Sequence, residues 1–207
     1  MKDRLEKDLT DLMAVPGLSG HEDRVRRAIS VLLSSEGIDG RVDRMGNLIA
    51  TFEGDADCPS VMLFTHMDQL GFIVRKIEDD GLICVERLGG VPERALASQA
   101  VTVCVGEGRD VDGVLYNKSH HATQPDEKYQ VQKISDMRID TGHGSRSAVE
   151  AAGIRIGTPV VYKPRVLPLS GEPIWVHSLK ALTACDQIDR PELFFGLYET
   201  MREKHRE

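Results

Sequence analysis

A succession of short, strand-like segments after Asp68 is the feature that most constrains the fold of this chain. Apolar segments alternate with turns such as Asp79-Asp80-Gly81, and no helical period separates them. The segments are GFIVRKI (71–77), GLICVERL (81–88), AVTVCVG (100–106) and DGVLYNK (112–118). Strands at such short spacing are typical of a compact β-barrel or β-sandwich. We therefore predict a β-rich unit over residues 69–164, with a further strand at 157–162 and a short helix at 145–153.

The residues before Asp68 have a different pattern. Apolar residues recur at helical spacing in two segments, which end at Pro16-Gly17 and at Gly37. The recurring residues are Leu5, Leu9, Leu12 and Met13, then Val25, Ile29, Leu32 and Leu33. Two strands are predicted next, at 47–52 and 60–65, and the second is apolar enough to be a central strand buried on both faces. The order helix, helix, strand, strand predicts an α/β layered domain.

The charge and the apolar pattern exclude two classes of partner. The 207 residues include 26 basic and 33 acidic side chains, which gives a net charge of −7. Clustered Lys and Arg are needed to neutralise nucleic-acid phosphates, so we expect no nucleic-acid partner. No apolar run approaches the roughly 18 residues that a membrane span needs, and the N-terminus lacks a signal-peptide core. We therefore expect no membrane partner.

The cysteines indicate a reducing compartment. Cys58, Cys84, Cys104 and Cys185 are far apart and form no C-x-x-C pair. Such spacing fits neither a zinc knuckle nor a disulfide framework, and it suits reduced thiols. We therefore predict a cytoplasmic protein.

The sharpest local feature is Thr65-His66-Met67-Asp68, directly after the predicted apolar strand. His66 and Asp68 are two positions apart, so both side chains would lie on one face of a strand, at the end where open α/β sheets bind ligands. An imidazole can bind a metal through one nitrogen while a carboxylate accepts a hydrogen bond from the other and fixes the tautomer. His66 is therefore a candidate metal ligand, and a purely structural histidine is the alternative.

A second candidate group is formed by Asp186 and Asp189. A carboxylate can bridge two divalent ions, which is the geometry of two-metal hydrolysis. The same residues also suit the acidic start of a helix that begins at Pro191. From the residues alone, both interpretations remain open.

Read together, several stretches of the chain resemble one family in content and order. They are PGLSGHED (16–23), DRMGNL (43–48), HMDQLGF (66–72), LGGV (88–91), NKSHH (117–121), IDTG (139–142) and GIRIGTPVV (153–161). Each stretch alone is a weak signal, but as a set they are specific. From about residue 8 to residue 182, the chain resembles the M42 metallo-aminopeptidases, which are glutamyl and deblocking aminopeptidases of the tetrahedral TET type.

The resemblance implies a partial aminopeptidase-type α/β catalytic domain interrupted by an inserted β-rich, barrel-like dimerisation domain. Residues 1–68 would be the N-terminal part of the catalytic domain, 69–164 the dimerisation domain, and 165–207 an incomplete return to the catalytic domain. The implied activity is that of a hydrolase that removes N-terminal residues from short peptides. The implied self-association is a dimer or a larger TET-like homo-oligomer.

The chemistry implied by the resemblance uses two divalent metal ions, zinc or cobalt, and a water that bridges them. By position, His66 matches the first metal ligand, and Asp68 matches the catalytic carboxylate that orients it. The family's bridging Asp follows a Lys-Ala-Leu motif, whereas here three residues intervene between Lys180-Ala181-Leu182 and Asp186. We favour Asp186 as the bridging ligand because an amide side chain follows it, and Asp189 is the competing alignment.

Two departures from the family pattern bear on activity. Gln69 stands where the family usually has Glu, which removes a charge beside the site. The family's general-base Glu and later metal ligands should lie beyond residue 207, so we expect a C-terminally truncated chain that is inactive by itself. One alternative is a non-catalytic or truncated paralogue that acts only as an oligomerisation scaffold. Another is a glycoside hydrolase, which the aromatic content of 5% disfavours because a sugar cleft needs stacking aromatics beside its two carboxylates.

Overall fold

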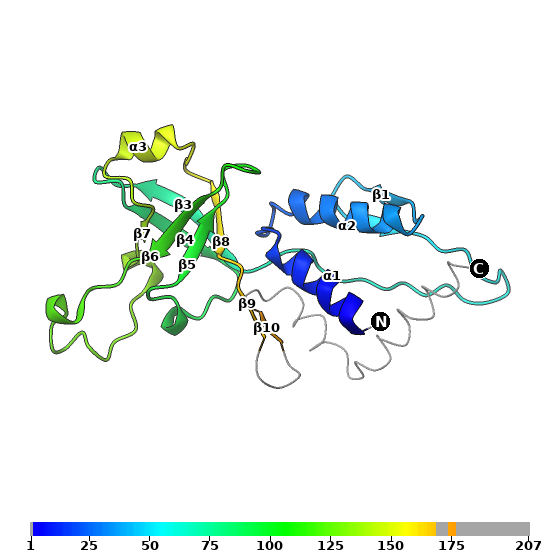
Figure 1. Cartoon of the computed structure of the whole chain (residues 1–207), viewed down its shortest axis with the longest axis horizontal. Helices are drawn as coiled ribbons and strands as arrows, with labels where there is room; N and C mark the ends of the chain where they lie inside the picture. The colour runs from blue at the N-terminus through cyan, green and yellow to red at the C-terminus, as the bar shows by residue number, and fades with distance from the viewer. Residues whose placement is uncertain (1, 169–173, 177–207) are drawn as a thin grey trace.

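A computed structural model describes residues 2–168 and 174–176 of the chain, which form two regions side by side along the long axis (Figure 1). The helical region contains α1 (Lys2–Ala14), α2 (Asp23–Ser35) and the hairpin of β1 (Gly40–Val42) and β2 (Leu48–Ala50). The barrel region begins at β3 (Gly71–Ile77) and ends at β8 (Pro159–Tyr162). The described residues are therefore a mixed α and β structure, with the change of character near Asp68 that the sequence predicts.

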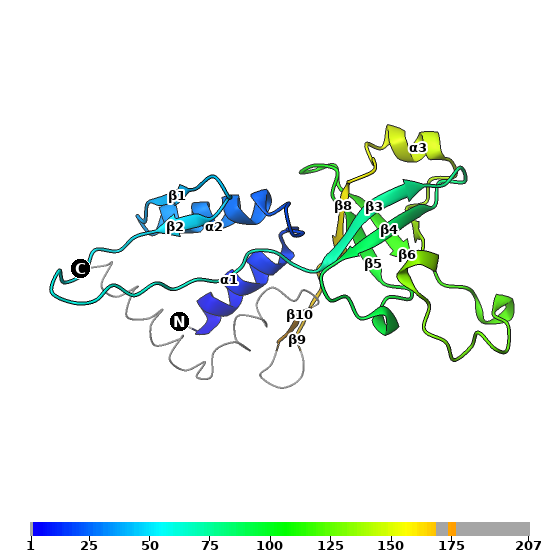
Figure 2. The same cartoon turned by 180° about the vertical axis from the view of Figure 1, so that it is seen from behind.

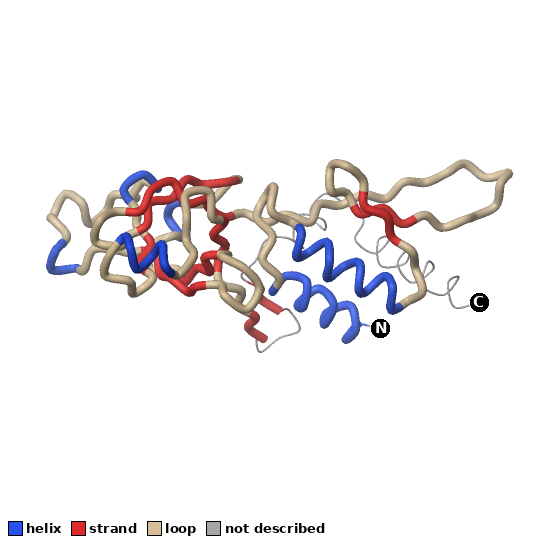
Figure 3. Tube along the Cα trace, turned by 90° about the horizontal axis from the view of Figure 1, so that it is seen from above, coloured by secondary structure: helices blue, strands red, loops and turns tan. Residues whose placement is uncertain are grey.

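The two N-terminal helices confirm the prediction made from the helical spacing of apolar residues. α1 and α2 lie side by side in the view from above (Figure 3). α2 ends where the sequence predicts, because Gly37 adopts a left-handed φ of 73°. The N–H groups of Gly37 and Ile38 return to the carbonyl groups of Ser34 (3.1 Å) and Leu33 (2.9 Å), which is a Schellman cap.

The β1–β2 hairpin lies beside α2 (Figure 2) and is held by one carboxylate. Asp43 accepts hydrogen bonds from the N–H groups of Met45 (2.9 Å) and Asn47 (2.9 Å), and from the Asn47 side-chain amide (2.8 Å). These bonds, first of all the one from the Asn47 side chain, lower the pKa of Asp43. The predicted strand at 47–52 is confirmed in shortened form as β2, whereas the sequence analysis missed β1.

The prediction of a buried central strand at 60–65 is wrong for the described structure. Residues 61–68 run as an extended segment without ladder pairing to any described strand. Val61 and Met62 are each 81% exposed and Phe64 is 86% exposed. A strand needs neighbours for its backbone groups and cover for its apolar faces, and the described residues of the helical region offer only the two-stranded hairpin.

The predicted β-rich unit is confirmed as a closed six-stranded barrel with the order β3-β4-β7-β6-β5-β8. All neighbouring strands are antiparallel, and β3 closes the barrel by pairing with β8 from Gly71↔Val161 to Ile73↔Pro159. The remaining strands are β4 (Ile83–Leu88), β5 (Ala100–Val103), β6 (Val111–Leu115) and β7 (Ile139–Asp140). The choice between barrel and sandwich, which the sequence left open, is thus made by this closure.

The main apolar core lies inside the barrel. Its fully buried members come from every strand and from the connections, among them Phe72, Ile83, Leu96, Val101, Leu115, Ile139, Val149 and Val160. Phe72 meets Tyr162 edge-on with ring centroids 5.7 Å apart, and burial raises the pKa of Tyr162 to about 12. The predicted short helix is α3 (Arg146–Ala151), which Ser145 caps by accepting a hydrogen bond from the Ala148 N–H (3.2 Å).

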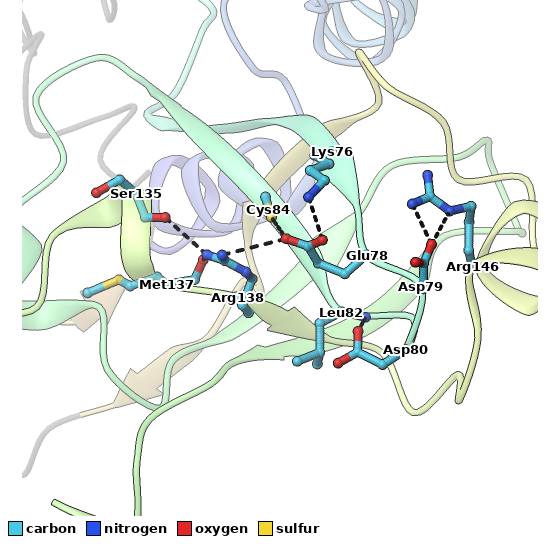
Figure 4. Close-up of polar contacts among 10 residues, drawn as sticks. All are labelled: Lys76, Glu78, Asp79, Asp80, Leu82, Cys84, Ser135, Met137, Arg138 and Arg146. Carbon is cyan, nitrogen blue, oxygen red and sulfur yellow. Dashed lines mark hydrogen bonds and ion pairs between the residues drawn. The ribbon is translucent and has the colours of Figure 1, made fainter.

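Polar contacts fix the end of the β3–β4 hairpin (Figure 4). Glu78 accepts from Lys76 (2.6 Å) and from the Cys84 thiol (3.1 Å), and it lies 3.6 Å from the Arg138 guanidinium; the Lys76 contact is the first cause of a lowered pKa of Glu78. Gly81 turns the chain with φ 89°, and a side chain there would press against the His143 carbonyl oxygen. The hairpin end therefore needs both the glycine and the carboxylate.

Three short 3-10 helices and one further hairpin complete the described elements. The 3-10 helices are η1 (Glu93–Ala95), η2 (His120–Ala122) and η3 (Ile134–Asp136), and the hairpin pairs β9 (Val166–Pro168) with β10 (Ile174–Val176). None of the described helices combines the length and apolar character that crossing a membrane requires. The helix predicted from Pro191 lies outside the described residues.

Candidate functional site

The candidate site lies where the extended segment enters the barrel, beside the loop between α1 and α2. Gln69 is 6% exposed, and its N–H donates to the Gly17 carbonyl at 2.8 Å. Leu18 forms a parallel β-bridge with Gln69. The residues just before β3 are therefore tied to the loop that the PGLSG sequence forms.

The structure brings His66 and Asp68 together, as the H-x-D spacing predicts. His66 Nδ1 lies 2.9 Å from Asp68 Oδ1 and 3.1 Å from the Asp68 backbone oxygen. Both neighbours of Nδ1 are acceptors, so the neutral ring carries its proton on Nδ1. The lone pair then lies on Nε2, on the side of the ring away from Asp68.

The pair is open to solvent rather than buried. The His66 side chain is 41% exposed and that of Asp68 is 34% exposed. A polar contact this exposed contributes little to the free energy of folding. Its consequence is orientation of the imidazole, and the exposed ring remains accessible to a ligand.

Ser19 is a member of this group that the sequence analysis missed. Its hydroxyl donates to Asp68 Oδ2, so both carboxylate oxygens of Asp68 have a partner. The sequence gives the PGLSG loop no obvious tie to His66, because 49 residues separate Ser19 from Asp68. Only the fold places them together.

The described residues fit part of a metal site. An imidazole whose second nitrogen is held by a carboxylate is a common ligand for zinc and cobalt, so His66 Nε2 suits such an ion. Within the described ranges, no three His, Cys, Asp or Glu side chains are grouped closely enough to hold a metal. Asp186 and Asp189, the predicted bridging ligand and its alternative, lie outside the described residues.

A cleft of about 460 Å³ lies next to the site, between the α1–α2 loop and the barrel. Leu18, His21 and Arg24 line one side, and Cys104 and Glu107 line the other. His66 and Asp68 do not line this cleft, so it is separate from the His66 pair.

Two ion pairs join the two regions at this cleft: the mostly buried pair of Arg24 with Asp110, and the exposed pair of Arg27 with Glu107. The Arg24 guanidinium contacts both carboxylate oxygens of Asp110, one at 2.9 Å, with side chains only 17% and 20% exposed. The Gly106 N–H also donates to Asp110, at 3.1 Å. Burial of Asp110 disfavours its charge, but the Arg24 and Gly106 hydrogen bonds outweigh burial and lower its pKa.

Comparisons with known proteins support the resemblance to the M42 aminopeptidases. The family pattern of the M42 glutamyl aminopeptidases matches residues 46–180. SgcX of Escherichia coli (strain K12), which carries an aminopeptidase name, is 33% identical over 203 residues, covering 94% of this chain and 54% of SgcX.

Two solved structures share the architecture. One is the Pyrococcus horikoshii TET1 peptidase, described as assembling into a tetrahedron or a large octahedral shell. It is 28% identical with a TM-score of 0.70, over 80% of this chain and 48% of that one. The other is a Thermotoga maritima structure described as an endoglucanase. It is 29% identical with a TM-score of 0.64, over 79% of this chain and 47% of that one.

The family match, and not the titles of the individual relatives, defines the class of this protein. Because the family pattern covers more than half of its residues, the chain belongs to the M42 glutamyl aminopeptidase family. It spans about half the length of SgcX and of the TET1 structure.

Proposed function

We propose that this chain carries part of the site of a metal-dependent aminopeptidase. The observation that carries the proposal is the 2.9 Å contact between His66 Nδ1 and Asp68, which leaves the lone pair on Nε2 of a side chain that is 41% exposed. In the proposed site His66 is a metal ligand and Asp68 is the catalytic carboxylate that orients it. Asp186 is the proposed bridging ligand, and Asp189 is the competing candidate.

The proposed cofactors are two divalent ions, zinc or cobalt. When bound, such ions polarise a peptide carbonyl and lower the pKa of a coordinated water. Asp68 keeps the proton of His66 on Nδ1. The unprotonated Nε2 therefore has the lone pair that would bind a metal ion. Residues outside the described ones supply the remaining ligands and the general base in this proposal.

The proposed substrates are short peptides, from which N-terminal residues are removed, in the cytoplasm. We propose that the barrel, within residues 69–164, is an inserted dimerisation domain between two parts of a catalytic domain, 1–68 and 165–207. The assembly described for the TET1 peptidase supports self-association of a related chain.

Two alternatives receive less support. A scaffold without activity leaves the His66–Asp68 pair unexplained, and the relative SgcX carries an aminopeptidase name. Glycoside hydrolysis needs two carboxylates flanking a sugar, and this chain offers few aromatic residues for a sugar-binding cleft.

Metal titration tests the proposal directly. Calorimetry with Zn²⁺ and Co²⁺ should detect binding that His66→Ala abolishes. The matched control is His143→Ala, since His143 Nδ1 lies 2.9 Å from the Thr141 hydroxyl in the barrel and outside the candidate site. Equal metal binding by His66→Ala and the unmodified chain would contradict the proposal.

The activity arm uses leucyl, glutamyl and acyl-blocked peptides, with the TET1 peptidase as the positive control. Metal-dependent release of N-terminal residues that His66→Ala abolishes would extend the proposal from metal binding to catalysis. Release that persists in His66→Ala would remove His66 from the site.

A further inference from the structure

We propose that Ser19 is a positioning residue for this site: its hydroxyl holds Asp68, and Asp68 holds the imidazole of His66. The inference rests on the proposed function, because it concerns the same candidate metal ligand. It assigns a role to the α1–α2 loop, which contributes no metal ligand in that proposal.

The contacts form a directed chain of three side chains. An ionised carboxylate can only accept, so the Ser19 hydroxyl donates to Asp68 Oδ2 and the His66 Nδ1–H donates to Asp68 Oδ1 at 2.9 Å. The two oxygens serve different partners. Rotation of the Asp68 carboxylate therefore breaks at least one hydrogen bond, so Ser19 restrains the group that restrains the imidazole.

The loop that presents Ser19 is itself fixed by its backbone. Leu18 is 1% exposed and is bridged to Gln69, the residue after Asp68. The His21 N–H donates to the Leu18 carbonyl at 2.7 Å, and the Gly20 N–H donates to Glu22 Oε1 at 2.7 Å. Ser19 thus lies between a buried anchor and a closed turn.

Gly20 is the residue that permits this turn. Its φ of 80° lies in the left-handed region, and a Cβ there would meet no atom within 4 Å. The constraint at position 20 is therefore one of backbone conformation and not of space. The turn directs the chain from Ser19 back toward the start of α2, and it keeps the hydroxyl beside Asp68.

The arrangement predicts a measurable property of His66 in the metal-free protein. With Asp68 held, the Nδ1–H tautomer dominates, because Nδ1 faces the Asp68 carboxylate and also the Asp68 carbonyl at 3.1 Å. With Ser19 removed, Asp68 can turn away and the two tautomers become closer in free energy. A serine that only closed its loop would leave the tautomer ratio unchanged.

The test is long-range ¹H–¹⁵N NMR of the imidazole nitrogens in the metal-free chain, with His66 assigned by its loss in His66→Gln. Ser19→Ala should lower the Nδ1–H to Nε2–H ratio by about fivefold, the factor expected for one ordinary hydrogen bond. Ser19→Thr keeps a hydroxyl and should restore the ratio. The matched control is Ser30→Ala, because the Ser30 hydroxyl donates to the Arg26 carbonyl within α2 (2.9 Å). An unchanged ratio in a folded Ser19→Ala protein would overturn the inference.

A second measurement separates this inference from the proposed function. Zn²⁺ affinity, measured by calorimetry, should fall by about tenfold in Ser19→Ala, the lower end of the loss usual for residues that orient a metal ligand. If His66→Ala does not reduce Zn²⁺ binding, the proposed function fails, and the tautomer ratio still decides the role of Ser19. If His66→Ala abolishes binding and Ser19→Ala leaves affinity and tautomer unchanged, the positioning role alone fails.

Discussion

The barrel region and the helical region differ in where their apolar residues find cover. In the barrel, residues from every strand point into one closed core, and Phe72, Ile83 and Ile139 are fully buried. In the helical region, the described core is small, with Met13, Leu18 and Val25 buried. The apolar segment 61–64 meanwhile lies exposed at the surface.

The difference shows that the same kind of sequence has two outcomes. GFIVRKI and SVMLFT are both short apolar runs, but the first finds strands on both edges and the second finds none among the described residues. Pairing and cover, and not apolar content alone, decide whether such a run becomes a buried strand. The candidate site lies at the boundary between the exposed, unpaired segment and the paired strand β3.

The largest expected effect comes from the same substitution made in each region. Phe72→Ala should lower the free energy of unfolding by about 3–5 kcal/mol, because it leaves a cavity in a closed core. Phe64→Ala should change it by less than about 0.5 kcal/mol, because Phe64 is 86% exposed. Urea unfolding followed by circular dichroism measures both. Equal losses would show that segment 61–64 is as well covered as the barrel core.

The next effect tests the junction between the regions. A Cβ at Gly71 would press against the Val160 carbonyl oxygen and the Leu18 side chain. Gly71→Ala should therefore lower the free energy of unfolding by about 1–3 kcal/mol through overpacking. Gly54→Ala is the control, because a Cβ there meets nothing within 4 Å. A Gly71→Ala protein as stable as this control would mean that β3 and β8 are less closely packed than described.

A smaller effect is expected from the more buried of the two ion pairs that join the regions. Arg24→Ala should lower the free energy of unfolding by about 1–2 kcal/mol, since it leaves the mostly buried Asp110 without its charged donor. Arg27→Ala is matched in type, but Arg27 and its partner Glu107 are 60% and 65% exposed, so a loss below about 0.5 kcal/mol is expected. Thermal unfolding of both variants measures the difference. Equal losses of stability would contradict the role of Arg24 in joining the two regions.

The smallest expected effect is the pH dependence of that ion pair. The pKa of Asp110 is lowered in the folded protein, so the folded state binds fewer protons here than the unfolded state, whose Asp pKa is about 3.9. Its stabilisation is therefore complete above that value and is lost as pH falls through the folded pKa. The stability difference between the unmodified chain and Asp110→Asn, measured by urea unfolding, should narrow from pH 7 toward pH 2. A difference that stays constant with pH would contradict the lowered pKa.

Much of the fold could be predicted from local signals. Gly37 marks the end of α2, and the Asp79-Asp80-Gly81 turn separates β3 from β4, because each is a short-range backbone requirement. Closure of the barrel could not be predicted, since the β3–β8 pairing joins residues far apart in the chain. The strand prediction at 60–65 failed for the same reason, because apolar content carries no information about neighbours.

The candidate site was predictable only in its shortest-range part. His66 and Asp68 are two residues apart, so their proximity follows from an extended backbone. Ser19 could not be connected with them, because its contact with Asp68 depends on the Leu18–Gln69 bridge between distant segments. Asp186 stays a prediction, since it lies outside the described residues.

The central claim is that the His66 imidazole binds a divalent metal through Nε2. Zinc K-edge X-ray absorption of the chain loaded with one equivalent of Zn²⁺ tests it most directly. The account predicts imidazole scattering with a Zn–N distance of about 2.0–2.1 Å that is lost in His66→Ala and kept in His143→Ala. Imidazole scattering that is unchanged in His66→Ala would contradict the account.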